Sequence, residues 1–156
     1  MAQRAQWQSI PIHTIEGFRF GHSTNLEAAT GCTVIVAPAG ASAGVDVRGG
    51  APASRETDLL RPENTVEAIH AVCLSGGSAF GLEAASGVAR ELEARGIGLD
   101  VGPTRVPIVC SSCIFDLAFG SASVRPGVEE GIEATRATLE ADPSPLAEGT
   151  VGAGTG

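Results

Sequence analysis

The sequence contains no lysine and no tyrosine; its ten basic residues are all arginine, and it has one tryptophan and one methionine. Without lysine, the chain can form neither a lysine-containing phosphate loop nor a lysine Schiff base. A formal net charge of −8 argues against nucleic acid or an anionic membrane surface as a partner. No apolar run approaches the roughly 18 residues of a membrane span. We therefore expect neither a nucleic-acid-binding nor a membrane-spanning protein.

The N-terminal residues contain no apolar segment of the kind found in secretory signals. The four cysteines, Cys32, Cys73, Cys110 and Cys113, lie in apolar runs and follow no pattern typical of a disulfide scaffold. Buried, reduced thiols in a cytoplasmic protein are the simplest interpretation. Cys110 and Cys113 have the C-x-x-C spacing, but one such pair does not complete a zinc site. We expect a cytoplasmic location, no metal and no cofactor.

The length of 156 residues is about that of one domain, and the apolar fraction of 43% is enough for a buried core. Charged residues make up only 18%, below the usual level of about 25%. This low charge suggests that another subunit covers part of the surface. With no internal repeat or linker, residues 1–156 form one mixed α/β domain or part of one, and residues 1–16 form an N-terminal arm.

Three segments have the pattern of strands. Phe18–Phe20 alternates around Arg19, and Cys32–Ala37 is an unbroken apolar run that ends before Pro38, as in a strand covered on both faces. Val45–Val47 is a candidate third strand. Ala68–Leu74 and Val106–Leu117 are two further apolar stretches, the first of which is also expected to be a strand.

Two segments have helical spacing. Apolar residues recur every three or four positions over about Ala79–Arg95, with Ser78 as the expected N-cap, Gly96 as the stop, and Glu91 four residues before Arg95. A second helix is expected over about Val128–Glu140, stopped by Asp142 and Pro143.

A glycine loop, LSGGSAFG (Leu74–Gly81), joins the expected strand to the first helix. Free N–H groups at a helix start favour a carboxylate, an anion or a developing oxyanion, and glycines let a ligand approach the backbone. This predicts that Gly76, Gly77, Ser78 and Phe80 line a substrate pocket. The loop lacks the G-x-G-x-x-G dinucleotide pattern, and Phe80 breaks the G-x-S-x-G nucleophile elbow. A tight turn with a purely structural role is the alternative.

The polar loop Gly49–Asn64, together with Arg48, is a second candidate. Glu56 or Asp58 would receive a substrate ammonium group beside the glycine loop, with Arg48 in the same wall. The alternative is a solvated charged loop with internal ion pairs. His70 lies in an apolar run, which favours a buried core histidine. A catalytic triad of Ser78, His70 and Asp58 can be written from the sequence, but no spacing supports its geometry.

Five segments together resemble a known family: VDVRGGAPASRETDLL (Val45–Leu60), CLSGGSAFGLEAASGV (Cys73–Val88), VPIVCSSCIFDL (Val106–Leu117), SVRP (Ser123–Pro126) and the final GTVGAGTG. Their order and spacing across about Gly17–Gly156 are similar to those of the self-processing L-aminopeptidase/D-esterase family, peptidase S58-like, which includes β-aminopeptidases and nylon-oligomer hydrolases. The chain resembles the N-terminal part of the larger subunit of such an enzyme.

The resemblance implies an α/β/β/α sandwich similar to N-terminal-nucleophile hydrolases, of which this chain is an incomplete part. In the family a precursor cuts itself before a Ser or Thr, which becomes the N-terminal nucleophile of a companion subunit. No serine here matches that nucleophile, so no catalytic residue is expected in this chain, and the chain alone is expected to be inactive.

Some relatives carry a tyrosine at the position of Phe80. The resemblance further implies a homo-oligomer of two-chain units that acts on a small peptide, amide or ester. An acyltransferase of the ornithine acetyltransferase type, on a related fold, and a non-catalytic subunit are the alternatives.

Overall fold

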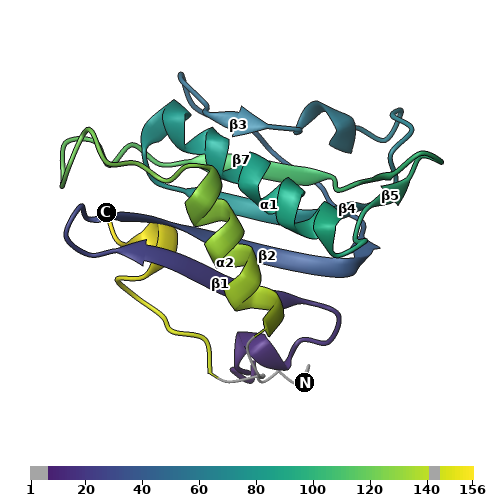
Figure 1. Cartoon of the computed structure of the whole chain (residues 1–156), viewed down its shortest axis with the longest axis horizontal. Helices are drawn as coiled ribbons and strands as arrows, with labels where there is room; N and C mark the ends of the chain where they lie inside the picture. Colours follow the sequence, from purple (N-terminus) through teal and green to yellow (C-terminus); the bar gives the residue numbers. More distant parts are fainter. Residues whose placement is uncertain (1–6, 141–144) are drawn as a thin grey trace, which may run out of the picture.

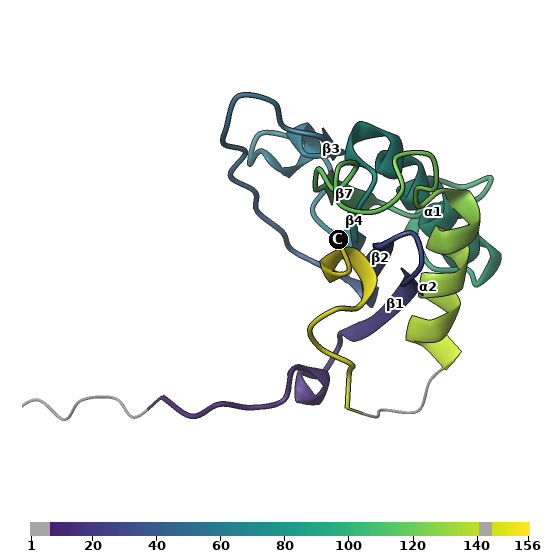
Figure 2. The same ribbon diagram turned by 90° about the vertical axis from the view of Figure 1, so that its left-hand side faces the viewer.

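The computed structural model describes residues 7–140 and 145–156, which build one mixed five-stranded sheet with helices on one face (Figures 1 and 2). In spatial order the strands are β1 (Arg19–Asn25), β2 (Thr30–Ala41), β4 (Ile69–Ser75), β7 (Val109–Cys113) and β3 (Ser54–Arg55). All neighbouring pairs are antiparallel except β4 and β7, which are parallel. The strands β5 (Leu99–Asp100) and β6 (Arg105–Val106) form a separate antiparallel pair after α1.

The parallel pair requires a crossover, and the chain supplies it through a short 3₁₀ helix, η3 (Ser78–Glu83), followed by α1 (Ala84–Ala94). The second helix, α2 (Val128–Glu140), crosses α1 on the same face of the sheet (Figure 1). Three other 3₁₀ turns are η1 (Ile12–Thr14), η2 (Asp58–Leu60) and η4 (Gly152–Gly154). No helix among the described residues is long and apolar enough to cross a membrane.

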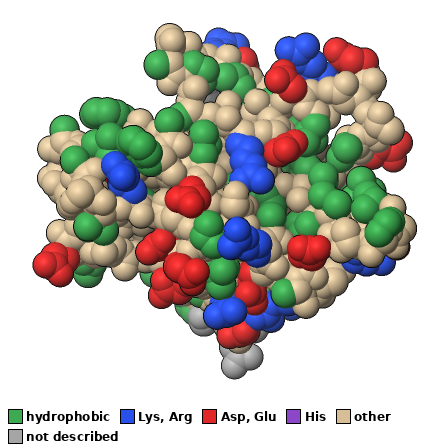
Figure 3. Space-filling view, turned by 45° about the horizontal axis from the view of Figure 1, so that its top comes forward, with side chains coloured by type: hydrophobic (Ala, Val, Ile, Leu, Met, Phe, Trp, Pro, Cys, Tyr) green, Lys and Arg blue, Asp and Glu red, His purple; other side chains and the backbone are tan. Residues whose placement is uncertain are grey.

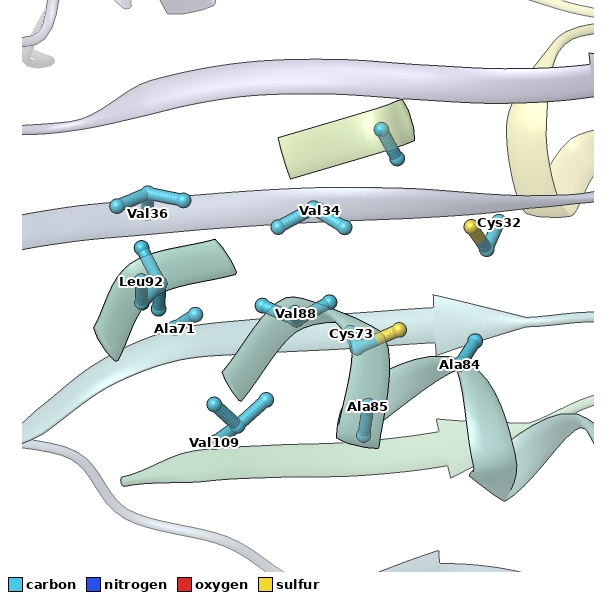
Figure 4. Close-up of a cluster of buried hydrophobic side chains, with 11 residues drawn as sticks. Cys32, Val34, Val36, Ala71, Cys73, Ala84, Ala85, Val88, Leu92 and Val109 are labelled. Carbon is cyan, nitrogen blue, oxygen red and sulfur yellow. The ribbon is translucent and has the colours of Figure 1, made fainter. Parts of the chain in front are cut away.

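The core lies between the sheet and the helices. Residues that alternate along the strands point toward α1, because successive side chains of a strand face opposite sides. Figure 4 shows these side chains meeting those of α1, with Val34, Val88 and Leu92 fully buried. The two helices approach closely because Gly87 of α1 and Gly131 of α2 lie at their crossing, where a Cβ atom would press on the backbone of the other helix.

No helix layer among the described residues covers the opposite face of the sheet (Figure 2). On this face lie the other strand residues, among them Phe20, Ile35, Val72 and Leu74, and Leu74 is 37% exposed. We call it the open face. The segment from Ala147 to η4 and the loop at residues 42–53 reach over its ends: the Ala147 carbonyl bonds His22, and a Cβ at Gly152 of η4 would contact Thr33 and His22, which point to this side.

Several expected boundaries hold. The helix α2 spans Val128–Glu140 as expected, while its expected stop at Asp142 and Pro143 lies outside the described residues. Gly96 ends α1 with φ +70°; its N–H donates to the Glu93 carbonyl, and the next N–H donates to that of Leu92. This is the pair of bonds of a Schellman motif, which needs a left-handed residue. Glu91 and Arg95 form the expected ion pair, at 2.8 Å.

Three expectations are wrong. Val45–Val47 is not a strand but exposed loop, because no strand lies beside it to take its N–H and C=O groups. Ser78 is not a side-chain N-cap: Gly77 occupies that position, η3 intervenes, and α1 begins only at Ala84. The strand containing Cys32–Ala37 does not end at Pro38 but runs to Ala41, because a register shift between Val36 and Ala41 accommodates the proline.

Candidate functional site

The glycine loop lies where β4 and β7 end. Because these strands are parallel, the segments that follow them leave the sheet at the same edge. They are joined there by backbone hydrogen bonds: the Ile114 N–H donates to the Ser75 carbonyl, and the Ser78 N–H donates to the Ile114 carbonyl, both at 2.9 Å. The glycine loop is thus held against the segment that contains Asp116.

Asp116 is 7% exposed and hydrogen-bonds two different elements. Its Oδ1 accepts the Gly77 N–H at 2.6 Å, and its Oδ2 accepts the Thr30 hydroxyl at 2.7 Å. The Gly76 N–H donates to the Gly31 carbonyl at 2.9 Å. The carboxylate therefore ties the glycine loop to the start of β2.

These bonds correct one part of the sequence-based argument. The N–H groups of Gly76, Gly77 and Ser78 all donate to acceptors in the chain itself, so they are not free to bind a ligand. An anion does lie at the loop, as glycine-rich turns favour, but it is the carboxylate of Asp116. That the four loop residues contact substrate stays a prediction, and it now depends on side chains.

The loop backbone is unusual at two consecutive residues. Gly77 has φ +83° and Ser78 has φ +54°, which is uncommon for a residue with a side chain. Gly77 is also restricted sterically, because a Cβ there would lie 3.0 Å from Arg125 Cβ and 3.3 Å from Pro126 Cδ. The Ser78 side chain is half-buried, and its hydroxyl forms no hydrogen bond with any described residue.

Aromatic side chains surround this edge. Phe80 is 59% exposed, and the guanidinium of Arg125 lies 3.9 Å from the centre of its ring. Phe115 and Phe119, on the segment after β7, are 73% and 72% exposed. Hydrophobic side chains gather at the left-hand end of the face shown in Figure 3, around a basic side chain. The edge thus offers an apolar surface with one cation.

The acidic loop does not meet the glycine loop directly. Ser54 pairs with Ser112 and Arg55 with Ser111, so Glu56 lies level with Cys110, whose thiol donates to the Glu56 carbonyl. The glycine loop follows Ser75, which is level with Cys113. Three residues of strand separate the two levels, about 10 Å at roughly 3.3 Å per residue.

The other charged candidates are paired locally. Asp58 lies 3.2 Å from Arg61, and Arg48 lies 2.6 Å from Asp46; all four side chains are exposed. Arg48 does line a cavity of about 380 Å³ between its own loop and the open face, with Val72, Cys110 and Ser112 among the other lining residues. The structure thus favours the solvated, internally paired loop that was the alternative. Contact of Glu56, Asp58 or Arg48 with substrate stays a prediction.

His70 is a buried histidine, as expected. Its Nδ1 accepts the Ile108 N–H at 3.2 Å, and burial, with the nearby Arg105, lowers its pKa. It lies near the start of β4, whereas Ser78 follows the end of that strand, and Asp58 is exposed beside Arg61. The structure therefore does not assemble a triad from Ser78, His70 and Asp58.

The cysteines behave as structural residues. All four are free thiols, and only Cys113 is not fully buried. Burial raises the pKa of Cys110, and it raises that of Cys113 to about 11, so both remain protonated at neutral pH. Neither cysteine therefore has the lowered pKa that is typical of a reactive redox thiol.

Sequence reasoning missed Asp116, Thr30 and Arg125. The sequence did contain a signal for Asp116, because it is the only charged residue in the apolar stretch Val106–Leu117. A carboxylate in such a run must be hydrogen-bonded if it is buried. No comparable signal marks Thr30, because its partners lie far from it in the sequence.

A mixed sheet with helices on one face and glycine-rich loops at the end of its parallel pair places the chain in the mixed α/β class. The model of peptidase family S58 matches residues 11–156. The chain therefore belongs to peptidase family S58, as its motifs indicated.

Relatives by sequence include proteins named as aminopeptidases and as oligomer hydrolases. An uncharacterized aminopeptidase of Mycobacterium leprae is 43% identical over 157 residues, covering 93% of this chain and 43% of the relative. A 6-aminohexanoate-oligomer endohydrolase of Kocuria is 37% identical over 139 residues, covering 88% of this chain and 36% of the relative. The chain thus spans less than half the length of these proteins.

Solved structures agree on the fold. A Pyrococcus horikoshii protein superposes with a TM-score of 0.69 at 21% identity, covering 94% of this chain and 44% of the other. A β-aminopeptidase from Burkholderia gives a TM-score of 0.62 at 23% identity, covering 94% and 42%. The expected mixed α/β fold is confirmed, and it is shared with these two structures.

Proposed function

We propose that this chain forms the scaffold and part of the substrate pocket of a self-processed amide or peptide hydrolase. The observation that carries the proposal is the family match over residues 11–156, combined with the meeting of three of its motifs at one edge of the sheet. The glycine loop, the IFDL segment and the final glycine segment all meet near Asp116, since a Cβ at Gly156 would contact Asp116 and Ala29.

The nucleophile in this proposal is an N-terminal Ser or Thr on a segment outside residues 1–156. Its hydroxyl attacks the substrate carbonyl, the amine leaves with a proton, and water then hydrolyses the acyl-enzyme ester. Two serines of β4 and β7 support a nucleophile that lies outside residues 1–156. The Ser75 hydroxyl donates to the Gly76 carbonyl, Ser111 Oγ is buried, and neither has a general base among its hydrogen-bond partners.

The open face supports a companion layer. Its apolar side chains, Phe20, Ile35, Val72 and Leu74, lie on a sheet whose other face is already covered. A mixed sheet with a solvated apolar face is unfavourable, and the relatives are more than twice as long as this chain. In the proposal the companion subunit covers this face, and two-chain units assemble into a homo-oligomer in the cytoplasm.

The substrate class follows from the relatives' names and the aromatic edge. Small peptides, amides or esters are the proposed substrates, with Phe80 forming an apolar wall and the residues of the loop lining the pocket. The enzyme needs no cofactor in this mechanism, because hydroxyl nucleophile and water supply all the chemistry.

Mass spectrometry and kinetics of the complete protein test the proposal. We expect a companion chain that begins with Ser or Thr, and turnover of an aminoacyl p-nitroanilide that a purified chain of residues 1–156 does not show. An intact chain without hydrolysis would contradict the proposal, and acyl transfer to an amino acid without hydrolysis would favour an acyltransferase. Turnover by residues 1–156 alone would overturn the outside nucleophile.

A further inference from the structure

Asp116 differs from the other described acids with low exposure. Glu91, which is similarly buried, is paired with two arginines, Arg95 at 2.8 Å and Arg136 at 3.1 Å. Asp116 forms no ion pair with any residue in the described ranges, and its two hydrogen bonds come from neutral donors. Removing a carboxylate from water without a cation is costly, so its location calls for an explanation.

The neighbours of Asp116 come from three distant parts of the chain. Thr30 begins β2, Gly76 and Gly77 follow β4, and Gly156 is the last residue of the sequence. The side chain fits because two of these residues, Gly76 and Gly156, carry no Cβ. A Cβ at Gly76 would overlap the Asp116 carboxylate, and one at Gly156 would lie 2.6 Å from Asp116 Cβ.

Asp116 also acts at the point where the backbone is strained. The bond from the Gly77 N–H to Oδ1 precedes the left-handed Ser78, whose own N–H is held by the Ile114 carbonyl. A non-glycine residue in such a conformation is unfavourable, and it persists only when its surroundings enforce it. Charge-assisted hydrogen bonds are about twice as strong as neutral ones, which suits them to this task.

We propose that Asp116 is the positioning residue of the site: by binding the Gly77 N–H and the Thr30 hydroxyl together, it holds Gly77–Ser78 in the left-handed conformation that directs Ser78 and Phe80 toward substrate. The inference rests on the proposed hydrolase function. It assigns Asp116 no contact with the reacting atoms; its effect passes through the loop.

The Asn variant separates hydrogen bonding from charge. In Asp116→Asn the amide oxygen can accept the Gly77 N–H, and the amide NH₂ can donate to the Thr30 oxygen, so both links survive in weaker form. In Asp116→Ala both links are lost and the Gly77 N–H is left buried without a partner. Thr30→Ser keeps the hydroxyl, whereas Thr30→Val removes it at similar volume.

The experiment measures kcat and KM of the complete protein with an aminoacyl p-nitroanilide, per folded molecule, well below each variant's Tm. We expect Asp116→Ala to lose at least 100-fold in kcat, Asp116→Asn to retain at least a tenth of it, and Thr30→Val to lose about tenfold while Thr30→Ser keeps it. The control Asp100→Asn, on the distant strand β5, should leave kcat unchanged.

Gly77 provides a readout independent of turnover. The wild-type Gly77 amide proton should resonate far downfield and exchange slowly, both features being weakened in Asp116→Asn and lost in Asp116→Ala. If Asp116→Ala does not fold, Thr30→Val and Asp116→Asn still decide the question through kcat and this resonance.

The outcomes are distinct. Equal kcat per folded molecule in wild type, Asp116→Ala and Thr30→Val would overturn the inference and leave a stabilising role only. Loss in Asp116→Asn as deep as in Asp116→Ala, with the Gly77 resonance intact, would also overturn it, because charge at the reacting atoms would then be required. A wild-type protein without hydrolase activity would instead overturn the proposed function.

Discussion

The two faces of the central sheet are built from the same strands but differ in what covers them. On the helix face, Val34, Val88 and Leu92 are fully buried. The two helices approach each other closely because glycines lie at their crossing. On the open face, Leu74 remains more than one-third exposed, and the neighbouring apolar side chains are only half-buried. Alternation along a strand explains which residue goes to which face. Alternation does not show which face is covered by other elements. The comparison shows that the described part of this chain covers only the helix face with a packed layer.

The largest expected effect is on the helix face. Leu92→Ala removes a fully buried side chain between α1 and the sheet and should lower the free energy of unfolding by about 3 kcal/mol. Leu74→Ala on the open face, in the chain of residues 1–156 alone, should cost less than about 1 kcal/mol. Urea denaturation of both variants measures the difference. Equal losses would mean that the two faces are equally covered.

Gly131→Ala tests how closely the helices of the covered face must approach. A Cβ there would press on the Ala84 carbonyl and lie 3.1 Å from the Val88 N atom, so α1 and α2 must separate. We expect a loss of about 2 kcal/mol, although alanine is the better helix former by about 1 kcal/mol. Gly50→Ala, where no atom lies within 4 Å, is the control and should change stability by less than about 0.5 kcal/mol. A stabilised Gly131→Ala variant would contradict the close crossing.

Glu91→Gln tests the ion pairs between the same two helices. Glu91 of α1 bonds both Arg95 of its own helix and Arg136 of α2. Losing its charge should cost about 1 kcal/mol, discounted because both arginines remain partly exposed to water. High salt should narrow the gap between wild type and variant, as thermal denaturation at two salt concentrations can show. Asp100→Asn, whose partner Arg105 is 3.5 Å away in an exposed pair, should have a smaller effect.

The smallest effect concerns pH on the open face. Burial lowers the pKa of His70, and its Nδ1 must stay unprotonated to accept the Ile108 N–H. The unfolded chain therefore binds more protons here than the folded one. This contribution to stability is fully present above the unfolded pKa of about 6.5 and is lost as the pH falls through the lower folded value. Denaturation from pH 8 to pH 5 should show a shallower decline for His70→Gln than for wild type, and parallel curves would refute it.

The sequence was sufficient to predict those parts of the fold that depend on apolar periodicity and on local backbone chemistry. The helix Val128–Glu140 and the Gly96 stop were predicted correctly, because apolar spacing and a left-handed cap are local properties. The strand predicted at Val45–Val47 failed because a strand also needs a neighbour, which no local pattern reveals. At the glycine loop, the attraction of its N–H groups for an anion was foreseen. That Asp116, 39 residues away, would supply the anion was not, because only the parallel pairing of β4 and β7 brings it there.

The first hairpin, β1 and β2, is synthesised well before the segment near Gly152 that bonds to it. The Gly152 N–H donates to Thr24, 128 residues earlier, and the Ala147 carbonyl bonds His22, 125 residues earlier. At a synthesis rate of roughly 5–20 residues per second, the first hairpin, which ends at Ala41, is complete about 5 to 22 s before these partners exist. During that interval the Thr24 hydroxyl lacks the Gly152 N–H, whereas the Thr33 hydroxyl can already bond His22 within the hairpin. A ribosome stalled shortly before Gly152 would therefore hold a hairpin that a protease reaches more easily than it does in the finished chain.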